Sequence, residues 1–333
     1  MTVTIKDVAR EADVAPSTVS KVLSGTGSIS EATRQRVQEA MQRLGYRPNA
    51  AARTLVTGQS GAIGVVVNRA AQLAFANPFF LEVLRSVGEV AEQEGYSLVV
   101  RTGADREDEE GKILELLRTR RVAGMVFPSS RVADHLLAEL VTLRQPFVLI
   151  GRPESPNPDI PWVNTDNIGD SYRATQLLLS RGHKNVVLVS GPTQLLVNQD
   201  RQSGYLQAMA EAGLAPTVVA AGYSLDSAFA AMTEWLEQDP APAALLCTDD
   251  LKAVGVYKAV QRSGRRLPDD MALLTFNDVP LAELLNPPLS CIRVPMADLG
   301  TQAATMLFAL LKGQELAQRQ VILPTEIVLR GSC

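Results

Sequence analysis

The chain has 333 residues, which is long enough for two or more domains with substantial hydrophobic cores. Its composition is that of an ordinary soluble protein, with 46% hydrophobic residues, 20% charged residues and a mean hydropathy of +0.05. No apolar run reaches the ~20 residues that a membrane span requires, and the N-terminus lacks a charged-then-apolar signal pattern. Cys247, Cys291 and Cys333 lack metal-type spacing, so we expect free thiols, a cytoplasmic location, no metal and no other cofactor.

The charge is distributed unevenly along the chain. The net charge is −4 overall, but residues 1–60 carry eight Lys or Arg against five Asp or Glu and are net +3. The remainder is therefore net −7. A small basic segment ahead of an acidic body suits a module that meets phosphate, although the asymmetry is modest.

The first 46 residues predict a small domain of three helices. Thr4 suits the N-cap of a helix over about residues 5–12, whose apolar positions recur at helical spacing. Pro16 fits the first turn of a second helix, where its missing N–H is tolerated. A third helix follows Ser30 and ends at Gly45. Two short helices joined by a tight turn are the geometry with which helix-turn-helix domains place a recognition helix in the DNA major groove.

A connector follows at residues 47–60. Asn49 could cap one or two Ala-rich turns, but a helix this short is marginal in water without a partner. We therefore expect the connector to be disordered alone and helical when it packs against something. Coupling between helix formation and packing would make the connector a switch.

From residue 61 onward, predicted strands and helices alternate. Continuous apolar runs indicate parallel strands buried on both faces, as in doubly wound sheets. The strands are predicted at 62–67, 97–101, 124–127, 147–150, 186–190, 217–221, 244–247, 272–276 and 321–329, and the helices near 78–94, 107–119, 133–142, 168–181, 200–212, 226–238, 250–263 and 296–312. The pattern restarts after residue 166, which implies two lobes with a cleft between them. Ligands of such folds bind at the carboxyl ends of the strands.

The head, the connector and the two lobes together resemble the LacI/GalR family of bacterial helix-turn-helix transcription regulators over essentially the whole chain. The most specific strings are residues 18–23 (TVSKVL), 44–55 (LGYRPNAAARTL) and 77–80 (NPFF). The resemblance implies an α/β fold, in which a three-helix helix-turn-helix domain precedes a bilobed periplasmic-binding-protein-like core of two doubly wound parallel sheets. The expected divisions are 1–46 for the DNA-binding domain, 47–60 for the hinge helix, 61–163 plus 292–322 for the N-terminal lobe, and 164–291 plus 323–333 for the C-terminal lobe.

The resemblance also implies a set of DNA-contacting residues. Ser17, Thr18 and Lys21 would meet base edges, while hydroxyl-bearing residues would mostly meet phosphates. Leu55 matches a wedge that enters the minor groove and partly unstacks a base step. The full set is Thr4, Pro16, Ser17, Thr18, Ser20, Lys21, Ser24, Ser28, Ser30, Thr33, Tyr46, Asn49, Ala52 and Leu55. The alternatives are a solvated helix face for the recognition residues and ordinary packing for Leu55.

A second set would bind an effector in the cleft. Arg201 matches a ligand-clamping arginine, whose fork suits paired hydroxyls or a carboxylate. Aromatic side chains flanked by Asp, Asn and Arg suit a sugar. The full set is Phe75, Arg152, Arg201, Tyr223, Asp249, Asn277 and Asp278. The alternative for Arg201 and Asp249 is a structural ion pair. Asp249-Asp250 replaces the family's usual Asn-Asp, and Thr275 stands where glycine is common, so the identity of the effector stays open.

The favoured function is a homodimeric transcription regulator, with a repressor as the first choice, that binds a palindromic operator in double-stranded DNA under the control of a small-molecule effector. The first alternative is a twin-lobed sugar-binding protein without a DNA role, which would need a signal peptide and no helix-turn-helix. The second is a nucleotide-dependent enzyme, but the sequence has no P-loop, dinucleotide fingerprint or paired nucleophile. We predict no catalytic residue, and a dimer rather than a tetramer because no leucine-heptad tail follows residue 330.

Overall fold

The computed structural model describes residues 3–24, 28–46, 60–67, 70–103, 106–129, 131, 135–238 and 244–333. Among these residues, no helix combines the length and the apolar character needed to cross a membrane. Most of the predicted connector lies outside this part of the chain, and so do Asn49, Ala52 and Leu55.

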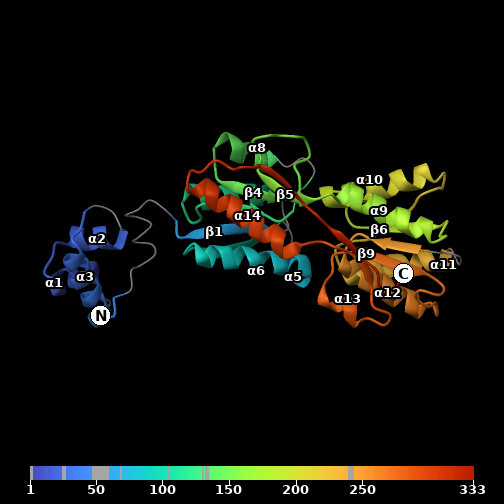
Figure 1. Ribbon diagram of the computed structural model, residues 1–333, viewed down its shortest axis with the longest axis horizontal. Helices are drawn as coiled ribbons and strands as arrows, with labels where there is room; N and C mark the ends of the chain where they lie inside the picture. The colour runs from blue at the N-terminus through green and yellow to red at the C-terminus, as the bar shows by residue number, and fades with distance from the viewer. Residues whose placement is uncertain are drawn as a thin grey trace.

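The N-terminal domain consists of α1 (Ile5–Glu11), α2 (Pro16–Ser24) and α3 (Glu31–Leu44). The three helices form a separate small bundle (Figure 1). They pack around a core of their own, in which Val8, Val19 and Val37 are fully buried. Gly45 ends α3 in the left-handed conformation with φ 61°, which glycine adopts without a steric penalty. The three predicted helices and their boundary residues are confirmed.

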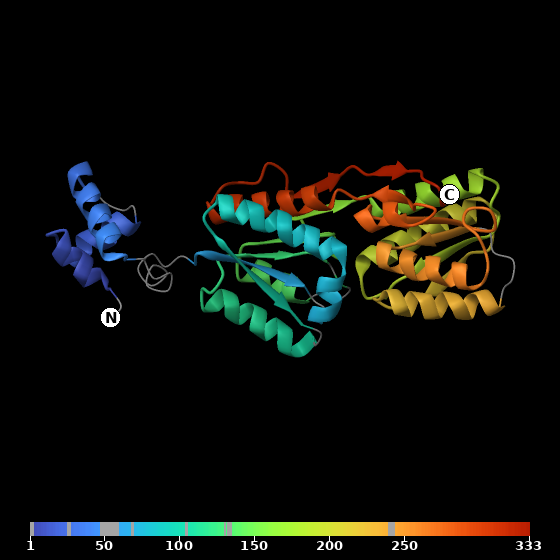
Figure 2. The same ribbon diagram turned by 90° about the horizontal axis from the view of Figure 1, so that it is seen from below.

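The first lobe is a six-stranded sheet in the order β11-β5-β4-β3-β1-β2, and every strand pair in it is parallel. Its strands are β1 (Ala62–Val67), β2 (Ser97–Thr102), β3 (Met125–Phe127), β4 (Phe147–Ile150), β5 (Trp162–Thr165) and β11 (Gln320–Leu323). Its helices are α5 (Ala71–Ala76), α6 (Pro78–Gln93), α7 (Arg106–Arg118), α8 (His135–Thr142) and α14 (Met296–Leu311). Figures 1 and 2 show α6 and α14 on one face of this sheet and α7 and α8 on the other.

The second lobe repeats this architecture in the order β12-β10-β9-β8-β6-β7. Its strands are β6 (Val186–Ser190), β7 (Thr217–Ala220), β8 (Ala244–Cys247), β9 (Ala272–Phe276), β10 (Ser290–Arg293) and β12 (Glu326–Val328), and only the β10–β12 pair of this sheet is antiparallel. Its helices are α9 (Asn167–Ser180), α10 (Leu196–Glu211), α11 (Leu225–Gln238), α12 (Asp250–Arg262) and α13 (Pro280–Leu284).

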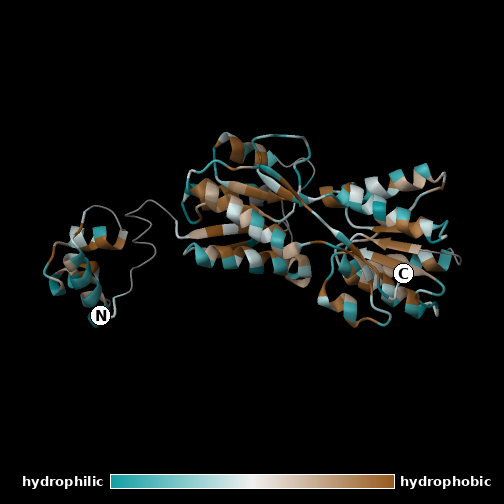
Figure 3. Ribbon diagram, in the orientation of Figure 1, coloured by the Kyte–Doolittle hydropathy of each residue, from teal (hydrophilic) through white to brown (hydrophobic). Residues whose placement is uncertain are grey.

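The strands are uninterrupted runs of apolar residues because helices cover both faces of each sheet. In β1, Val65 and Val67 pack into the cluster that contains α6 and α14, whereas Val66 packs into the cluster that contains α7 and α8. Successive side chains of a strand point to opposite faces, so a strand buried on both sides carries no polar alternation. Figure 3 shows the result as hydrophobic strands between helices with polar outer surfaces. The predicted doubly wound sheets are confirmed.

Several predicted boundaries differ from the structure. The strand predicted at 321–329 is wrong, because Pro324 divides it into β11 in the first sheet and β12 in the second. The end of the chain therefore passes from one lobe to the other (Figure 1). The helices α5 and α13 and the strands β5 and β10 were not predicted, and α10 begins four residues earlier than expected. Sheet membership also changes a few residues away from the expected lobe boundaries, with Thr165 and Leu323 in the first sheet and Ile292 in the second.

Candidate DNA-binding and effector-binding sites

The helix α2 presents a polar surface in front of a buried apolar stripe. Val19 and Val22 are buried, whereas Pro16, Ser17 and Lys21 are exposed. Thr18 and Ser20 are half-buried. Of the three predicted base-reading residues, Ser17 and Lys21 therefore lie on the outer face of α2, and Thr18 lies at its edge.

Three of the predicted phosphate-contacting hydroxyls take part in helix capping. Thr4 donates from its backbone nitrogen and its Oγ1 to Asp7 Oδ2 at 2.9 and 2.7 Å, and these bonds hold the pKa of the Asp7 carboxyl below its usual value. The Ser30 hydroxyl accepts from the Thr33 backbone nitrogen at 3.3 Å and lies 2.8 Å from Thr33 Oγ1. These side chains therefore have a structural role that does not depend on DNA.

The remaining residues of the DNA set have different environments. Ser28 is exposed, and Tyr46 is half-buried against the core of the N-terminal domain. The backbone of Ser24 ends α2, while its side chain lies outside the described part of the structure, as do Asn49, Ala52 and Leu55 in full.

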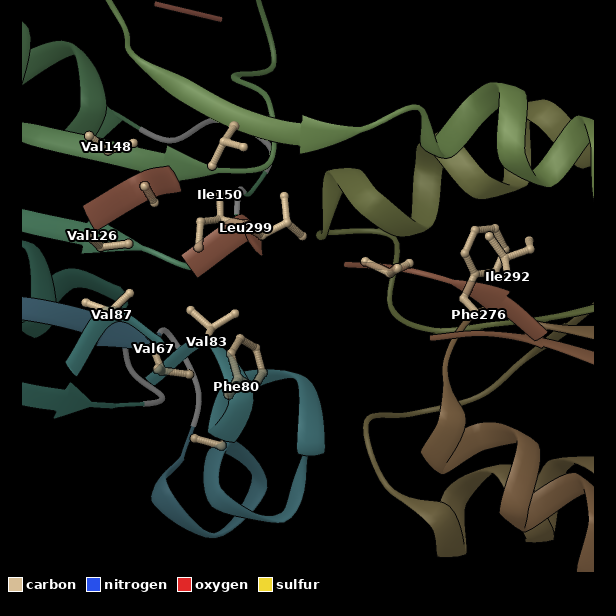
Figure 4. Close-up of a cluster of buried hydrophobic side chains, with 14 of the residues drawn as sticks. Val67, Phe80, Val83, Val87, Val126, Val148, Ile150, Phe276, Ile292 and Leu299 are labelled. Atoms are coloured by element: carbon tan, nitrogen blue, oxygen red, sulfur yellow. The ribbon is translucent and has the colours of Figure 1, made fainter. Parts of the chain in front are cut away.

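A pocket lies between the two lobes. From the first lobe it is lined by Asn77, Phe79, Phe80, Pro128, Ser129, Ile150, Gly151, Asn164, Thr165 and Leu299, and from the second lobe and the connecting segments by Asn167, Leu195, Val197, Asn198, Arg201, Tyr223, Thr248, Asp249, Lys252, Asn277 and Val294. Most of these residues follow the carboxyl ends of strands, as predicted. Figure 4 shows Phe80, Ile150 and Leu299 at the end of the first lobe that faces the strands bearing Phe276 and Ile292.

Arg201 is oriented by uncharged partners. Its Nε donates to Asn167 Oδ1 at 2.8 Å and its Nη1 donates to the Thr248 carbonyl oxygen at 2.5 Å. The guanidinium carbon also lies 3.8 Å from the centroid of the Phe276 ring. Burial lowers the pKa of Arg201 to about 10, so the side chain is still charged at neutral pH. A buried guanidinium that lines a pocket and is held only by uncharged hydrogen-bond acceptors is well placed to bind a ligand.

Asp249 forms an ion pair inside the pocket. Its side chain caps α12 by accepting from the Lys252 backbone nitrogen at 2.9 Å, and its other oxygen binds the Lys252 ammonium group. Lys252 is 2% exposed and lines the pocket itself. Sequence analysis did not identify Lys252, although a lysine in the first turn of a helix that follows a buried strand was a signal for it.

Asn277 connects the pocket to a buried carboxyl group. Its backbone has φ 72°, a left-handed conformation that asparagine tolerates better than most residues, and its Nδ2 donates to Asp250 Oδ2 at 2.9 Å. Burial raises the pKa of Asp250 to about 7, and Asp250 Oδ1 has no hydrogen-bond partner among the described residues. Tyr223 completes the predicted residues that do line the pocket.

Three residues of the predicted effector set lie elsewhere. Phe75, on α5, is 48% exposed and does not line the pocket. Asp278 is held by two arginines, with 2.8 Å to Arg293 Nε and 2.8 Å to Arg330 Nη1. Arg152 makes a two-pronged ion pair with Asp200, with 3.0 and 2.5 Å between donor and acceptor. Asp278 and Arg152 each form a carboxylate–guanidinium pair outside the pocket and do not line it.

The Arg152–Asp200 pair joins the two lobes. Arg152 follows β4 of the first sheet, whereas Asp200 lies in α10 of the second lobe. A backbone bridge between Arg131 and Leu195 makes a second contact between the loop that follows β3 and the start of α10. The lobes are therefore held together beside the pocket, which Gly151 and Leu195 line, by contacts that a change of lobe angle would break.

Comparisons with known proteins agree with this architecture. Residues 4–49 match the family model described as bacterial regulatory proteins, lacI family, and residues 175–333 match a periplasmic binding protein-like domain. The HTH-type transcriptional regulator CelR of Thermobifida fusca is 33% identical over 333 residues, which cover 99% of this chain and 98% of that protein.

Two solved structures are similar over the full length. The CelR–cellobiose complex has a TM-score of 0.76 at 29% identity, covering 99% of this chain and 100% of that one. The lac repressor dimer bound to operator and the anti-inducer ONPF has a TM-score of 0.87 at 25% identity, covering 100% and 99%. The fold and the two sites thus define a DNA-binding transcription regulator with a bilobed ligand-binding core. The chain belongs to the LacI family.

Proposed function

We propose that this regulator is a cytoplasmic homodimer that binds a palindromic operator and senses a sugar or sugar derivative in the pocket between its lobes. The observation that carries the proposal is that one pocket is walled by both lobes and contains Arg201, Asp249 and Asn277 beside aromatic side chains. A ligand that touches both lobes binds more tightly to one lobe angle than to another, and this difference in affinity is what allows it to shift the conformation. We propose no catalytic role for the chain.

The sugar class is supported by similarity and by chemistry. The related CelR has been solved as a cellobiose complex. The pocket combines hydrogen-bonding groups with aromatic faces from Phe79 and Tyr223, a mixture that suits a molecule with hydroxyls on its edge and C–H groups on its faces.

The dimer is supported by apolar side chains that a monomer would leave in water. Leu81 on α6 is 47% exposed, and Leu281 and Leu284 on α13 are 41% and 79% exposed. Leu281 and Leu284 are three residues apart on the same helix, and contiguous exposed apolar side chains are typical of interfaces. The similar lac repressor structure is a dimer on its operator. In a dimer, two N-terminal domains would read two half-sites, with Ser17, Thr18 and Lys21 toward base edges and Leu55 as the proposed minor-groove wedge.

The test is selection of operators from a pool of random palindromic duplexes at low salt, followed by titration of the full chain. We expect nanomolar specific binding that weakens with salt, because phosphate contacts release counterions. Lys21→Ala should weaken binding to the selected duplex about 10-fold or more, whereas Lys6→Ala, on the exposed surface of α1, should have a smaller and sequence-independent effect. A chain that binds no palindromic duplex, with or without sugars, would contradict the DNA role and favour a sugar-binding protein.

A further inference from the structure

The charges that line the pocket do not balance. Among the described residues of its wall, the charged side chains are Arg201, Lys252 and Asp249. Asp249 is paired with Lys252, and the two bonds of Arg201 go to an amide oxygen and a carbonyl oxygen. The wall therefore carries one cation more than it has anions.

Carboxylates just behind the wall are already occupied. Asp200 is bound by Arg152, and Asp170 is bound by Arg173 and by the Thr325 hydroxyl at 2.6 Å. Asp250 is the buried carboxyl group that binds an amide instead of a base, and burial raises its pKa to about 7. Since Asp250 is protonated in a large share of molecules at neutral pH, it offsets only part of the excess positive charge.

The backbone leaves room for the Lys252 ammonium group beside the end of β6. A Cβ atom at Gly191 would lie 2.8 Å from Lys252 Cε and 3.0 Å from Lys252 Nζ, and 2.7 Å from Asn198 Nδ2. Lys252 and Asn198 both line the pocket. The glycine therefore lets a buried ammonium and an amide come together at the wall of the second lobe.

We propose that the effector is a sugar derivative with an anionic group, either a carboxylate or a phosphate, which Lys252 and Arg201 bind together. This inference depends on the proposed sugar-sensing function and narrows its ligand class. The Lys252 ammonium has three N–H groups, of which Asp249 takes one, and Arg201 Nη2 makes no hydrogen bond within the described residues. Charge-assisted hydrogen bonds in a buried site are stronger than those between neutral groups. A neutral sugar would leave the excess positive charge of the wall only partly offset by the nearby carboxylates.

The test uses the full chain and matched probes that differ in one group. Glucose, glucuronate and glucose 6-phosphate are compared by isothermal titration at constant ionic strength, with inorganic phosphate as a bare anion. We expect at least one anionic probe to bind about 10-fold or more tightly than glucose. The glucuronate and glucose 6-phosphate arms distinguish a carboxylate from a phosphate as the preferred group.

Variants locate the effect at Lys252. Lys252→Met should weaken the preferred anionic probe about 10-fold or more, whereas Lys258→Met, on the exposed side of the same helix, should leave its affinity unchanged. Asp249→Asn should act in the opposite direction, because it removes the competing carboxylate. If Lys252→Met fails to fold because Asp249 is left unpaired, the double variant Asp249→Asn/Lys252→Met removes both charges and should still prefer the anion less than Asp249→Asn does.

Three results would overturn the inference: tighter binding of glucose than of every anionic probe, no saturable binding of any anionic probe, or unchanged anion affinity in Lys252→Met. Operator binding is measured on the same samples. If duplex binding persists while the anionic probes fail, the inference on ligand class is wrong and the regulator function stands. If no duplex is bound, the proposed function itself fails.

Discussion

The ion pair between Arg152 and Asp200 should favour the closed arrangement of the lobes. Asp200 has a side chain that is 6% exposed and Arg152 one that is 35% exposed, and the two share hydrogen bonds of 3.0 and 2.5 Å. Hydrogen bonding to Asp200 raises the pKa of Arg152, so the guanidinium stays charged over the whole physiological range. We expect Arg152→Gln and Asp200→Asn each to shift the lobes toward an open state.

The size of the shift follows from the geometry. Opposite charges about 3 Å apart attract by about 5 kcal/mol at an effective dielectric constant of about 20. Desolvation of Asp200 and the partial exposure of Arg152 to solvent reduce the net contribution to about 1–2 kcal/mol. That free energy corresponds to a change of about 5- to 30-fold in the ratio of open to closed molecules.

Single-molecule energy transfer measures this ratio directly. Dyes are placed on cysteines that replace the exposed Glu115 of α7 and Glu234 of α11, with Cys333 changed to serine. The double variant at Arg152 and Asp200 should open no further than the more open single variant, because each substitution already removes the same contact. The control is Arg118→Gln, which breaks an exposed ion pair with Glu139 inside the first lobe. An open-to-closed ratio within twofold of the original in Arg152→Gln, or additive effects in the double variant, would refute the reasoning.

Three further predictions concern buried groups. The pKa of Asp250 is about 7 in the folded chain, against an ordinary value of 3.8. Its contribution to the free energy of unfolding is therefore complete below pH 3.8 and is lost as the pH rises through 7. In urea titrations, Asp250→Asn should therefore gain stability relative to the original chain between pH 4 and pH 8, by at most about 4 kcal/mol. Tyr205→Phe should lower the free energy of unfolding in urea by about 1–3 kcal/mol, because the Tyr205 hydroxyl accepts from the Thr217 backbone nitrogen at 2.7 Å inside the core. Gly191→Ala should weaken anion binding in calorimetry with a loss of stability below about 1 kcal/mol, because the new methyl group would meet the movable ends of side chains.

Matched variants check the last three predictions. Equal stability differences at both pH values would show that Asp250 ionises freely in the folded chain. Tyr172→Phe, which removes a surface hydroxyl bonded to Glu211 at 2.6 Å, should cost less than Tyr205→Phe, and the reverse order would contradict the burial reasoning. Gly204→Ala should destabilise the chain far more than Gly191→Ala, because its methyl group would lie 2.0 Å from the Ile168 carbonyl oxygen, which is backbone and cannot move aside.

The strands were predictable from the sequence where several consecutive residues are all buried, because such a segment is an uninterrupted run of apolar residues. The strands β4, β6, β8 and β9 have the predicted bounds because each is a short run of apolar residues covered by helices on both faces. The strand β12 was merged with β11, because local patterning shows that both segments are extended but does not show which sheet each one joins. Edge strands such as β12 are only partly buried, so their sequences also carry a weaker signal.

The site was predictable to the extent that the ends of strands converge. Arg201, Tyr223, Asp249 and Asn277 were chosen from their places after strands or from the family resemblance, and all four line the pocket. Arg152 was also placed after a strand, but it binds Asp200, which is 48 residues away in the sequence. The burial of Lys252 depends on the space beside Gly191, which only the packed structure shows. Partnerships between charges that are distant in sequence are the part that local patterns do not encode.

The chain passes between the two sheets three times, after β5, after β10 and between β11 and β12. Three short parallel tethers resist sliding and separation of the lobes more than they resist bending, so the remaining freedom is close to a single rotation. Such a hinge converts the arrival of a ligand of any shape that fits the pocket into movement along one path. The start of β1, which follows the connector to the N-terminal domain, would then move along the same direction by an amount that depends on the lobe angle. A connection that changes the positions of two N-terminal domains on two DNA half-sites requires such a movement.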